Sequence, residues 1–161
     1  MRLFIAIQLP DEMKKVLVAC MHDLKKQGVE GNYVPAQNLH LTLAFIGEYD
    51  DPAGVKRVLE SVPLLPFRLS LSEKGNFGNL LWAGVKGNQK LKTYVKDLRE
   101  ALKEADIPFD HDKFVPHITL VRKAAAKKPY EVHLGKAEMM VKKASLMKSE
   151  MKNGKVIYRE M

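Results

Sequence analysis

The chain has 161 residues, a formal net charge of +8, 46% hydrophobic residues and a single cysteine. This profile is typical of one compact soluble domain or two small fused lobes, and it excludes fibrous and broadly disordered chains. The apolar runs are far shorter than the ~20 residues that span a bilayer, so we expect no membrane segment. The lone thiol of Cys20 cannot form an intramolecular disulfide, and the first residues lack the features of a signal peptide. We therefore expect a cytoplasmic protein.

The excess positive charge lies in the second half of the chain. Residues 1–80 carry nine Lys/Arg and nine Asp/Glu, whereas residues 81–161 carry eighteen and ten. This asymmetry favours an anionic partner. Scattered lysines that only keep the surface soluble would give the same count, so charge alone decides nothing.

The chain begins with a predicted strand and helix. Residues 3–7 form a short apolar run that suits a buried strand, and Asp11 is expected to cap the helix that follows. Gly28 supplies the stop signal for this helix. The apolar residues between them have the spacing of one helical face: Met13, Val16, Leu17, Cys20, Met21 and Leu24.

A polar loop through Asn32 and Pro35 leads to the next predicted strand, over residues 39–47, whose residues alternate between apolar and polar or aromatic types. Asp51 then precedes Pro52 at the expected start of a short helix. Beyond it, three alternating apolar residues predict a further strand: Phe67, Leu69 and Leu71.

The second half repeats the order of strand, helix and strand. Residues 80–85 form the strand, Asn88 is the expected helix cap, and the next strand carries His117. The displacement is 77 residues between the first strands (80 − 3), between the caps (88 − 11) and between His40 and His117 (117 − 40). Three equal displacements indicate an internal duplication, which predicts two lobes about a pseudo-twofold axis.

The end of the chain predicts two more strands, over residues 145–151 and 155–161, joined by Asn153-Gly154 as a type I′ hairpin turn. Val132 and Leu134 predict an earlier strand. No Pro-, Gly- or Ser-rich linker separates the two halves. We therefore expect residues 1–161 to form a single domain of two interleaved, pseudo-symmetric lobes.

The most informative motif is His-x-Thr, which occurs at His40 and Thr42 and again at His117 and Thr119. Side chains alternate along a strand, so each histidine shares one face with its threonine while the residues between face the core. If the two polar faces meet, threonine hydroxyls can bind phosphate oxygens and two imidazoles can act as base and acid. A lone histidine in a strand is more often structural, but the paired repeat favours catalysis.

The stretches that carry these motifs resemble the 2H phosphoesterase superfamily, specifically its RNA 2′,3′-cyclic phosphodiesterase branch, also called 2′-5′ RNA ligase. The matching stretches are RLFIAIQLP (2–10), NLHLTLAFIGE (38–48), GNLLWAGV (78–85) and FVPHITLVR (114–122). The resemblance implies a bilobal α+β fold with two antiparallel sheets lining a central cleft and helices outside. It implies metal-independent opening of RNA 2′,3′-cyclic phosphates to 2′-phosphomonoesters, and ATP-independent 2′-5′ joining as the reverse reaction.

By this resemblance, His40 and His117 are the catalytic pair and Thr42 and Thr119 hold the phosphate. The family resemblance favours His117 as the group that activates water and His40 as the one that protonates the departing 3′-oxygen. The sequence itself leaves the two roles interchangeable.

Arg122 follows the second motif and is expected to neutralise phosphate charge. Simple strand parity places it on the face opposite His117, so it needs a bulge or a strand end to reach the site. The first repeat has Phe45 at the equivalent position, so this part of the site is not symmetric, and Phe45 could instead stack a base.

Other chemistry-bearing residues rank lower. Residues 110–112 (Asp-His-Asp) are expected to form a polar loop, Cys20 to pack in the core, and His22 and His133 to lie unpartnered on the surface. Trp82 falls on a strand predicted as core. Other aromatic residues that could stack nucleobases are Tyr33, Phe77 and Phe109, and lysines that could guide an RNA backbone are Lys123, Lys127 and Lys128.

Three hypotheses follow. The first is a monomeric enzyme that needs no cofactor or metal and acts on RNA ends or small cyclic-phosphate nucleotides. The second is a non-catalytic basic module that binds RNA and leaves its ends unchanged. The third is a metallohydrolase in which His40, His117 and residues 110–112 bind a divalent ion.

Overall fold

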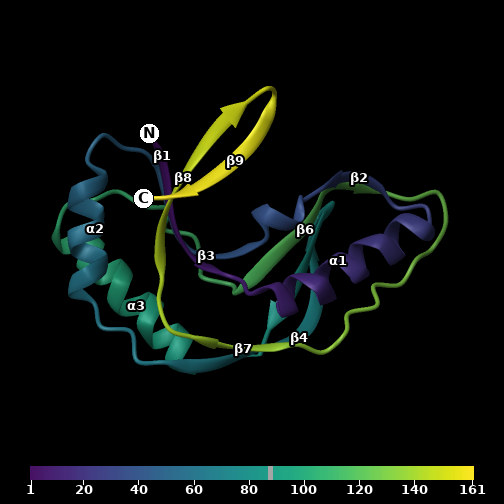
Figure 1. Ribbon diagram of the computed structural model, residues 1–161, viewed down its shortest axis with the longest axis horizontal. Helices are drawn as coiled ribbons and strands as arrows, with labels where there is room; N and C mark the ends of the chain where they lie inside the picture. The colour runs from purple at the N-terminus through teal and green to yellow at the C-terminus, as the bar shows by residue number, and fades with distance from the viewer. Residues whose placement is uncertain (87–88) are drawn as a thin grey trace.

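The computed structural model describes residues 1–86 and 89–161 (Figure 1). These residues form three α-helices, one short 3₁₀ helix and nine strands. In chain order the elements are β1 (Arg2–Gln8), α1 (Asp11–Lys26), β2 (Glu30–Tyr33), η1 (Ala36–Asn38), β3 (His40–Glu48), α2 (Pro52–Ser61), β4 (Phe67–Phe77), β5 (Leu80–Val85), α3 (Gln89–Glu104), β6 (His117–Ala125), β7 (Glu138–Val141), β8 (Ser145–Lys152) and β9 (Lys155–Glu160). None of the described helices is long and apolar enough to cross a membrane.

The strands form two antiparallel sheets. One has the order β3-β1-β8-β9 and the other has the order β2-β6-β5-β4-β7. The strand that carries His40 is an edge of the first sheet, and the strand that carries His117 is next to an edge of the second. The predicted α+β fold with two antiparallel sheets is therefore confirmed.

The helices cover the sheets crosswise (Figure 1). Helix α1 comes from the first half of the chain but packs against β6, while α3 comes from the second half and packs against β3. Helix α2 packs against α3 and β8, and the two motif strands β3 and β6 lie against each other. Buried residues of both sheets and all three helices join in one hydrophobic cluster. The two halves therefore stabilise each other through exchanged helices.

Helix α1 follows its predicted apolar stripe but not its predicted cap. Pro10 occupies the N-cap position and makes no side-chain cap bond, so the expectation that Asp11 is the cap is wrong. Asp11 is instead the first helical residue, where its negative charge still suits the positive end of the helix dipole. Gly28 ends the helix as predicted, with a φ of +88° that favours glycine. Asp51 caps α2 as predicted, and its side chain accepts a hydrogen bond from the Gly54 N–H.

Two segments differ from the predicted strands. The polar loop through Asn32 is partly a strand, because β2 pairs with β6. Val132 and Leu134 do not form a strand, since residues 126–137 have no regular structure and β7 begins only at Glu138. Their side chains are partly buried and pack against the core. The spacing of these two apolar residues therefore indicated their burial correctly but predicted the wrong backbone conformation.

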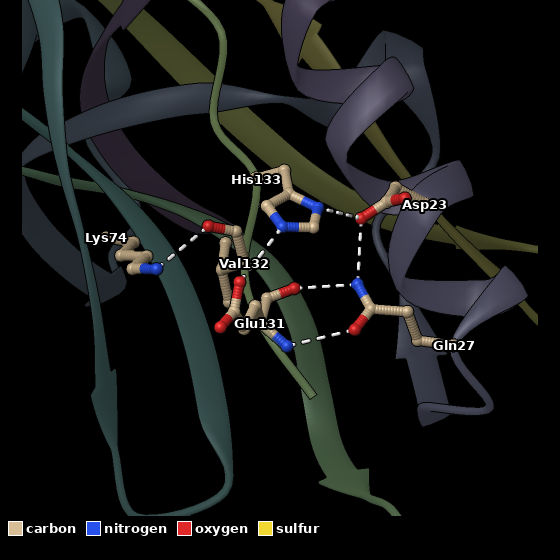
Figure 2. A network of polar contacts seen from close by, with 6 residues as sticks. All are labelled: Asp23, Gln27, Lys74, Glu131, Val132 and His133. Carbon is tan, nitrogen blue, oxygen red and sulfur yellow. Dashed lines mark hydrogen bonds and ion pairs between the residues drawn. The ribbon is translucent and has the colours of Figure 1, made fainter. Parts of the chain in front are cut away.

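The irregular segment is held onto α1 by polar contacts instead of strand pairing (Figure 2). The Gln27 side-chain amide donates to the Glu131 carbonyl (2.7 Å) and accepts from the Glu131 N–H (2.9 Å). His133 bonds the carboxylates of Asp23 (2.9 Å) and Glu131 (3.2 Å), which raise its pKa above the ordinary value. Lys74 donates to the Val132 carbonyl. His133 is exposed as predicted, but the expectation that it lacks partners is wrong.

The duplication is visible in the strand register, with small shifts. Ala6 pairs with Thr42, and Trp82 pairs with Thr119, so the first strands are displaced by 76 residues (82 − 6) rather than the 77 expected. The expected cap Asn88 lies outside the described residues.

The C-terminal hairpin forms as predicted. Asn153 and Gly154 join β8 to β9 with φ angles of 52° and 75°. Positive φ at both central residues is the requirement of a type I′ turn. The hairpin extends beyond the rest of its sheet (Figure 1).

Because α3 covers the sheet that carries His40, truncating its buried face should destabilise the protein. Leu98 is fully buried, and we expect Leu98→Ala to lower the free energy of unfolding by about 2–5 kcal/mol through lost burial and a residual cavity. Urea denaturation measures the change, with Glu100→Ala on the exposed face of the same helix as the control. Equal effects of the two substitutions would contradict this packing.

Candidate active site

Each motif strand contains a β-bulge just after its threonine. On β3 the register passes from the Ala6–Thr42 pair directly to Ile5–Ala44, so Leu43 is an extra residue. On β6 it passes from the Trp82–Thr119 pair to Leu81–Val121, so Leu120 is extra. The two bulges occupy the same place in the two repeats, 77 residues apart (120 − 43).

The bulges change which residues face the site. Leu120 and Val121 are both fully buried, so two consecutive side chains of β6 point into the core. The next residue, Arg122, is exposed and lies on the same face as His117 and Thr119. The expectation from simple parity, that Arg122 lies on the face opposite His117, is therefore wrong because the strand is not regular. Phe45 follows the equivalent bulge on β3 in the same way.

The bulge on β6 results from packing that the sequence does not show. A regular strand would turn either Leu120 or Val121 away from the core, and both are apolar. The bulge disrupts the regular hydrogen bonding between β5 and β6 at one position, and in return it keeps two large apolar side chains out of water.

His40 is fixed by hydrogen bonds on both ring nitrogens. Its Nδ1 lies 2.7 Å from the carbonyl oxygen of Asn38, and its Nε2 lies 2.9 Å from the Thr42 hydroxyl oxygen. A carbonyl oxygen only accepts, so Nδ1 carries the proton, and in the neutral ring Nε2 accepts from Thr42. His117 repeats the arrangement, with Nδ1 2.6 Å from the carbonyl of Val115. In both histidines the proton of the neutral ring therefore lies on Nδ1, and Nε2 is the unprotonated nitrogen.

Two aromatic rings flank each histidine. The His40 ring lies 5.0 Å from the Phe4 ring and 5.1 Å from the Tyr158 ring, measured between centroids. Tyr158 belongs to β9, the edge opposite β3, so this sheet curls until its far strand reaches His40. A small apolar cluster of Phe4, Ala6 and Met147 packs with Phe45 and Tyr158 inside the curl.

Phe77 and Trp82 hold the corresponding place beside His117, at ring distances of 5.2 Å and 5.9 Å. The expectation that Trp82 lies in the core is wrong: it is half-buried and contacts His117, because the core side of β5 is formed by its neighbours Leu81 and Ala83. The Trp82 ring lies over Gly75 of β4, where a methyl group would overlap it. Its Nε1 is buried and has no acceptor among the described residues.

The charges of the site act on His40. Burial lowers the pKa of His40 below its ordinary value of 6.5, and the positive charges of Arg122 and His117 lower it further, while the Asn38 carbonyl opposes them. These two groups come from the other sheet, so the structure brings His40, His117 and Arg122 within electrostatic range. The three lie on β3 and β6, which contact each other, and the positive charge of Arg122 disfavours a proton on His40.

Several sequence candidates lie outside this group. Residues 110–112 form a turn in which the Asp112 N–H bonds the Asp110 carboxylate, and the His111 ring stacks on Phe109. In the described part of the chain, no three His, Cys, Asp or Glu side chains gather to hold a metal ion. Cys20 is buried as predicted, and burial raises its thiol pKa. Tyr33 hydrogen-bonds the Val29 carbonyl beneath the Lys25 ammonium group.

Three residues of the His40 environment were not singled out from the sequence. Phe4 is hidden in a continuous apolar run, Tyr158 is more than a hundred residues away in the chain, and Asn38 belongs only to the matching stretch around His40. Strand alternation from Ala6 would have found Phe4. Only the curl of the sheet identifies Tyr158.

Comparison with known proteins identifies the family of this chain. Residues 11–152 match the family model described as the 2′-5′ RNA ligase superfamily. The chain belongs to this superfamily. The RNA 2′,3′-cyclic phosphodiesterase of Thermotoga maritima is 34% identical over 136 residues, which cover 76% of this chain and 70% of that protein. The protein of the same name from Archaeoglobus fulgidus is 32% identical over 130 residues, covering 76% and 72%.

Solved structures of the superfamily have the same fold. The crystal structure of E. coli LigT complexed with 3′-AMP matches with a TM-score of 0.86 and 27% sequence identity, covering 99% of this chain and 94% of LigT. The structure of TT0787 of Thermus thermophilus matches with a TM-score of 0.78 and 28% identity, covering 100% and 95%. The fold of this superfamily member is therefore that of LigT along almost its whole length.

The electrostatic contact across the two sheets can be tested directly. Replacing Arg122 by Gln removes one of the charges that disfavour protonated His40, so we expect the pKa of His40 to rise in Arg122→Gln. Titration of the His40 ring signals by NMR measures the shift, and Lys123→Gln, at the next residue of the strand, is the control. An unchanged His40 pKa in Arg122→Gln would show that the two side chains do not face each other.

Proposed function

We propose that this protein hydrolyses RNA 2′,3′-cyclic phosphate ends to 2′-phosphomonoesters, with His40 and His117 as a metal-independent acid–base pair. The observation that carries the proposal is that the two histidine rings are held by the same hydrogen bond and therefore in the same tautomer. Each donates Nδ1–H to a backbone carbonyl two residues earlier, and the two rings lie within electrostatic range of each other on contacting strands of different sheets. The relatives named RNA 2′,3′-cyclic phosphodiesterase support the same substrate class.

In the proposed reaction, His117 Nε2 takes a proton from water as the water oxygen bonds to phosphorus. The bond from phosphorus to the ribose 3′-oxygen breaks on the opposite side, and His40 Nε2–H protonates that oxygen. The products are a 2′-phosphomonoester and a free 3′-hydroxyl, with one water consumed. Proton exchange with solvent then restores both imidazoles.

His40 must be protonated to act as the acid, although its pKa is lowered in the free protein. The negative charge of a bound phosphate offsets the positive charge of Arg122, so substrate binding favours the protonated His40 ring. Protonated Nε2 no longer accepts from Thr42, which frees that hydroxyl to donate to a phosphate oxygen. Thr119 has the equivalent place on β6 and is proposed to bind the phosphate from the other side.

The same site could carry out 2′-5′ joining with a different nucleophile. A ribose 5′-hydroxyl in place of water would attack the cyclic phosphate, and loss of the 3′-oxygen would leave a 2′-5′ linkage. The two histidines would perform the same proton transfers, so no activated nucleotide is required.

We further propose that residues 1–161 act as one domain and as a monomer in the cytoplasm. One chain supplies both histidines, and the exchanged helices make each half depend on the other. The buried thiol of Cys20 supports a reducing compartment.

Single substitutions should separate the acid–base mechanism from its alternatives. We expect His40→Ala and His117→Ala each to lower turnover of an RNA 2′,3′-cyclic phosphate by at least about 10²-fold, the typical contribution of one proton transfer. The assay follows the appearance of the 2′-phosphate in excess chelator, and His22→Ala on the exposed face of α1 is the control.

Each alternative predicts a different result. Retained turnover in both histidine variants would remove the mechanism. Loss of wild-type activity in chelator would favour the metallohydrolase. Salt-sensitive RNA binding with unchanged RNA ends would favour the non-catalytic basic module.

A further inference from the structure

The apolar surface beside His40 continues onto the C-terminal hairpin. Tyr158 contacts the His40 ring, and Val156 lies two residues away on the same face of β9. Met151 of β8 pairs directly with Val156 and therefore shares that face. We name Met151, Val156 and Tyr158 the hairpin stripe.

The outer part of this stripe is exposed. Met151 is 68% and Val156 is 40% exposed, and both are large apolar side chains. The Asn38 side chain donates to the Val156 carbonyl (3.0 Å), and the Asn38 carbonyl holds His40 Nδ1. The stripe is thus fixed to the residue that orients His40, and it leads from the site toward the hairpin turn.

Positive charge lies at the tip of the hairpin. Lys152 and Lys155 pair with each other on either side of the turn, and both are exposed. Because side chains alternate along a strand, these two lysines leave the hairpin on the face opposite Met151 and Val156, next to the outer end of the stripe. Nearer the body, Lys148 and Arg159 are both engaged by Glu150. An exposed apolar track that starts beside His40, on a hairpin whose tip carries two long cationic side chains, matches single-stranded RNA, whose bases offer apolar faces and whose backbone is anionic.

We propose that the hairpin stripe, with Lys152 and Lys155, is a subsite for the nucleotides that precede the cyclic phosphate. This inference rests on the proposed function. A 2′,3′-cyclic phosphate closes the 3′ end of an RNA, so the rest of the substrate can leave the site only on the side of its preceding nucleotides. The hairpin offers the preceding nucleotides a surface on which their bases can lie. The enzyme should therefore act on oligonucleotide ends more efficiently than on mononucleotides.

The test compares a short oligonucleotide that ends in a 2′,3′-cyclic phosphate with a 2′,3′-cyclic mononucleotide. We expect the wild-type protein to have the higher kcat/KM on the oligonucleotide. We expect the double variant Met151→Ser/Val156→Ser to lower kcat/KM on the oligonucleotide about 5- to 10-fold more than on the mononucleotide. Both positions are at the exposed end of a hairpin, and circular dichroism checks that the variant is folded.

The control is Leu65→Ser, which replaces a side chain that is 76% exposed, between α2 and β4 and outside the hairpin stripe. It should change neither rate. A second variant, Lys152→Gln/Lys155→Gln, should make turnover of the oligonucleotide less dependent on salt concentration.

The results distinguish the subsite from the proposed function. Equal kcat/KM for the two wild-type substrates, or a double variant that keeps the wild-type preference, would overturn the subsite alone. An unchanged substrate preference in the double variant is also the result expected if the stripe binds a protein instead of RNA. Absence of wild-type turnover on both substrates would overturn the proposed function, and the subsite with it.

Discussion

The site depends on an extra residue directly after the threonine of each motif strand. Leu43 and Leu120 create bulges at equivalent places, and each bulge keeps two neighbouring apolar side chains in the core. The consequence on the other face is that the residue after the bulge joins the histidine and threonine. A packing requirement of the interior thereby determines which side chain, Arg122 or Phe45, completes each half of the site. The chemistry of the surface is set by the core beneath it.

The two halves of the site share a backbone scheme but differ in environment. Each histidine is oriented through Nδ1 by a carbonyl two residues before it, so the tautomer is decided locally. His40 lies inside a curled sheet against Phe4 and Tyr158, where burial lowers its pKa. His117 lies beside Phe77 and Trp82, and Arg122 on its own strand supplies a cation that the first repeat lacks. Duplication gives two imidazoles in the same tautomer, and their different surroundings suit them to the different roles that the proposed mechanism assigns.

The exchange of helices explains how two lobes can hold one site. Helix α1 covers the sheet of His117 and α3 covers the sheet of His40, so neither sheet is fully covered by the helices of its own half. Relative movement of the lobes would expose parts of a shared hydrophobic core. The distance between the two imidazoles is therefore maintained by the most strongly buried part of the molecule.

The sequence by itself determined the helices, most strands, the type I′ turn and the pair of His-x-Thr motifs, because these follow from local periodicity and turn chemistry. It also determined, through strand alternation, that His40 lies with Thr42 and His117 with Thr119. Only the tertiary structure decided that Arg122 joins them, since a bulge depends on how Leu120 and Val121 fit the core. The same holds for Tyr158 beside His40 and Trp82 beside His117, because sheet curl and the choice of buried face arise from packing between elements distant in the chain.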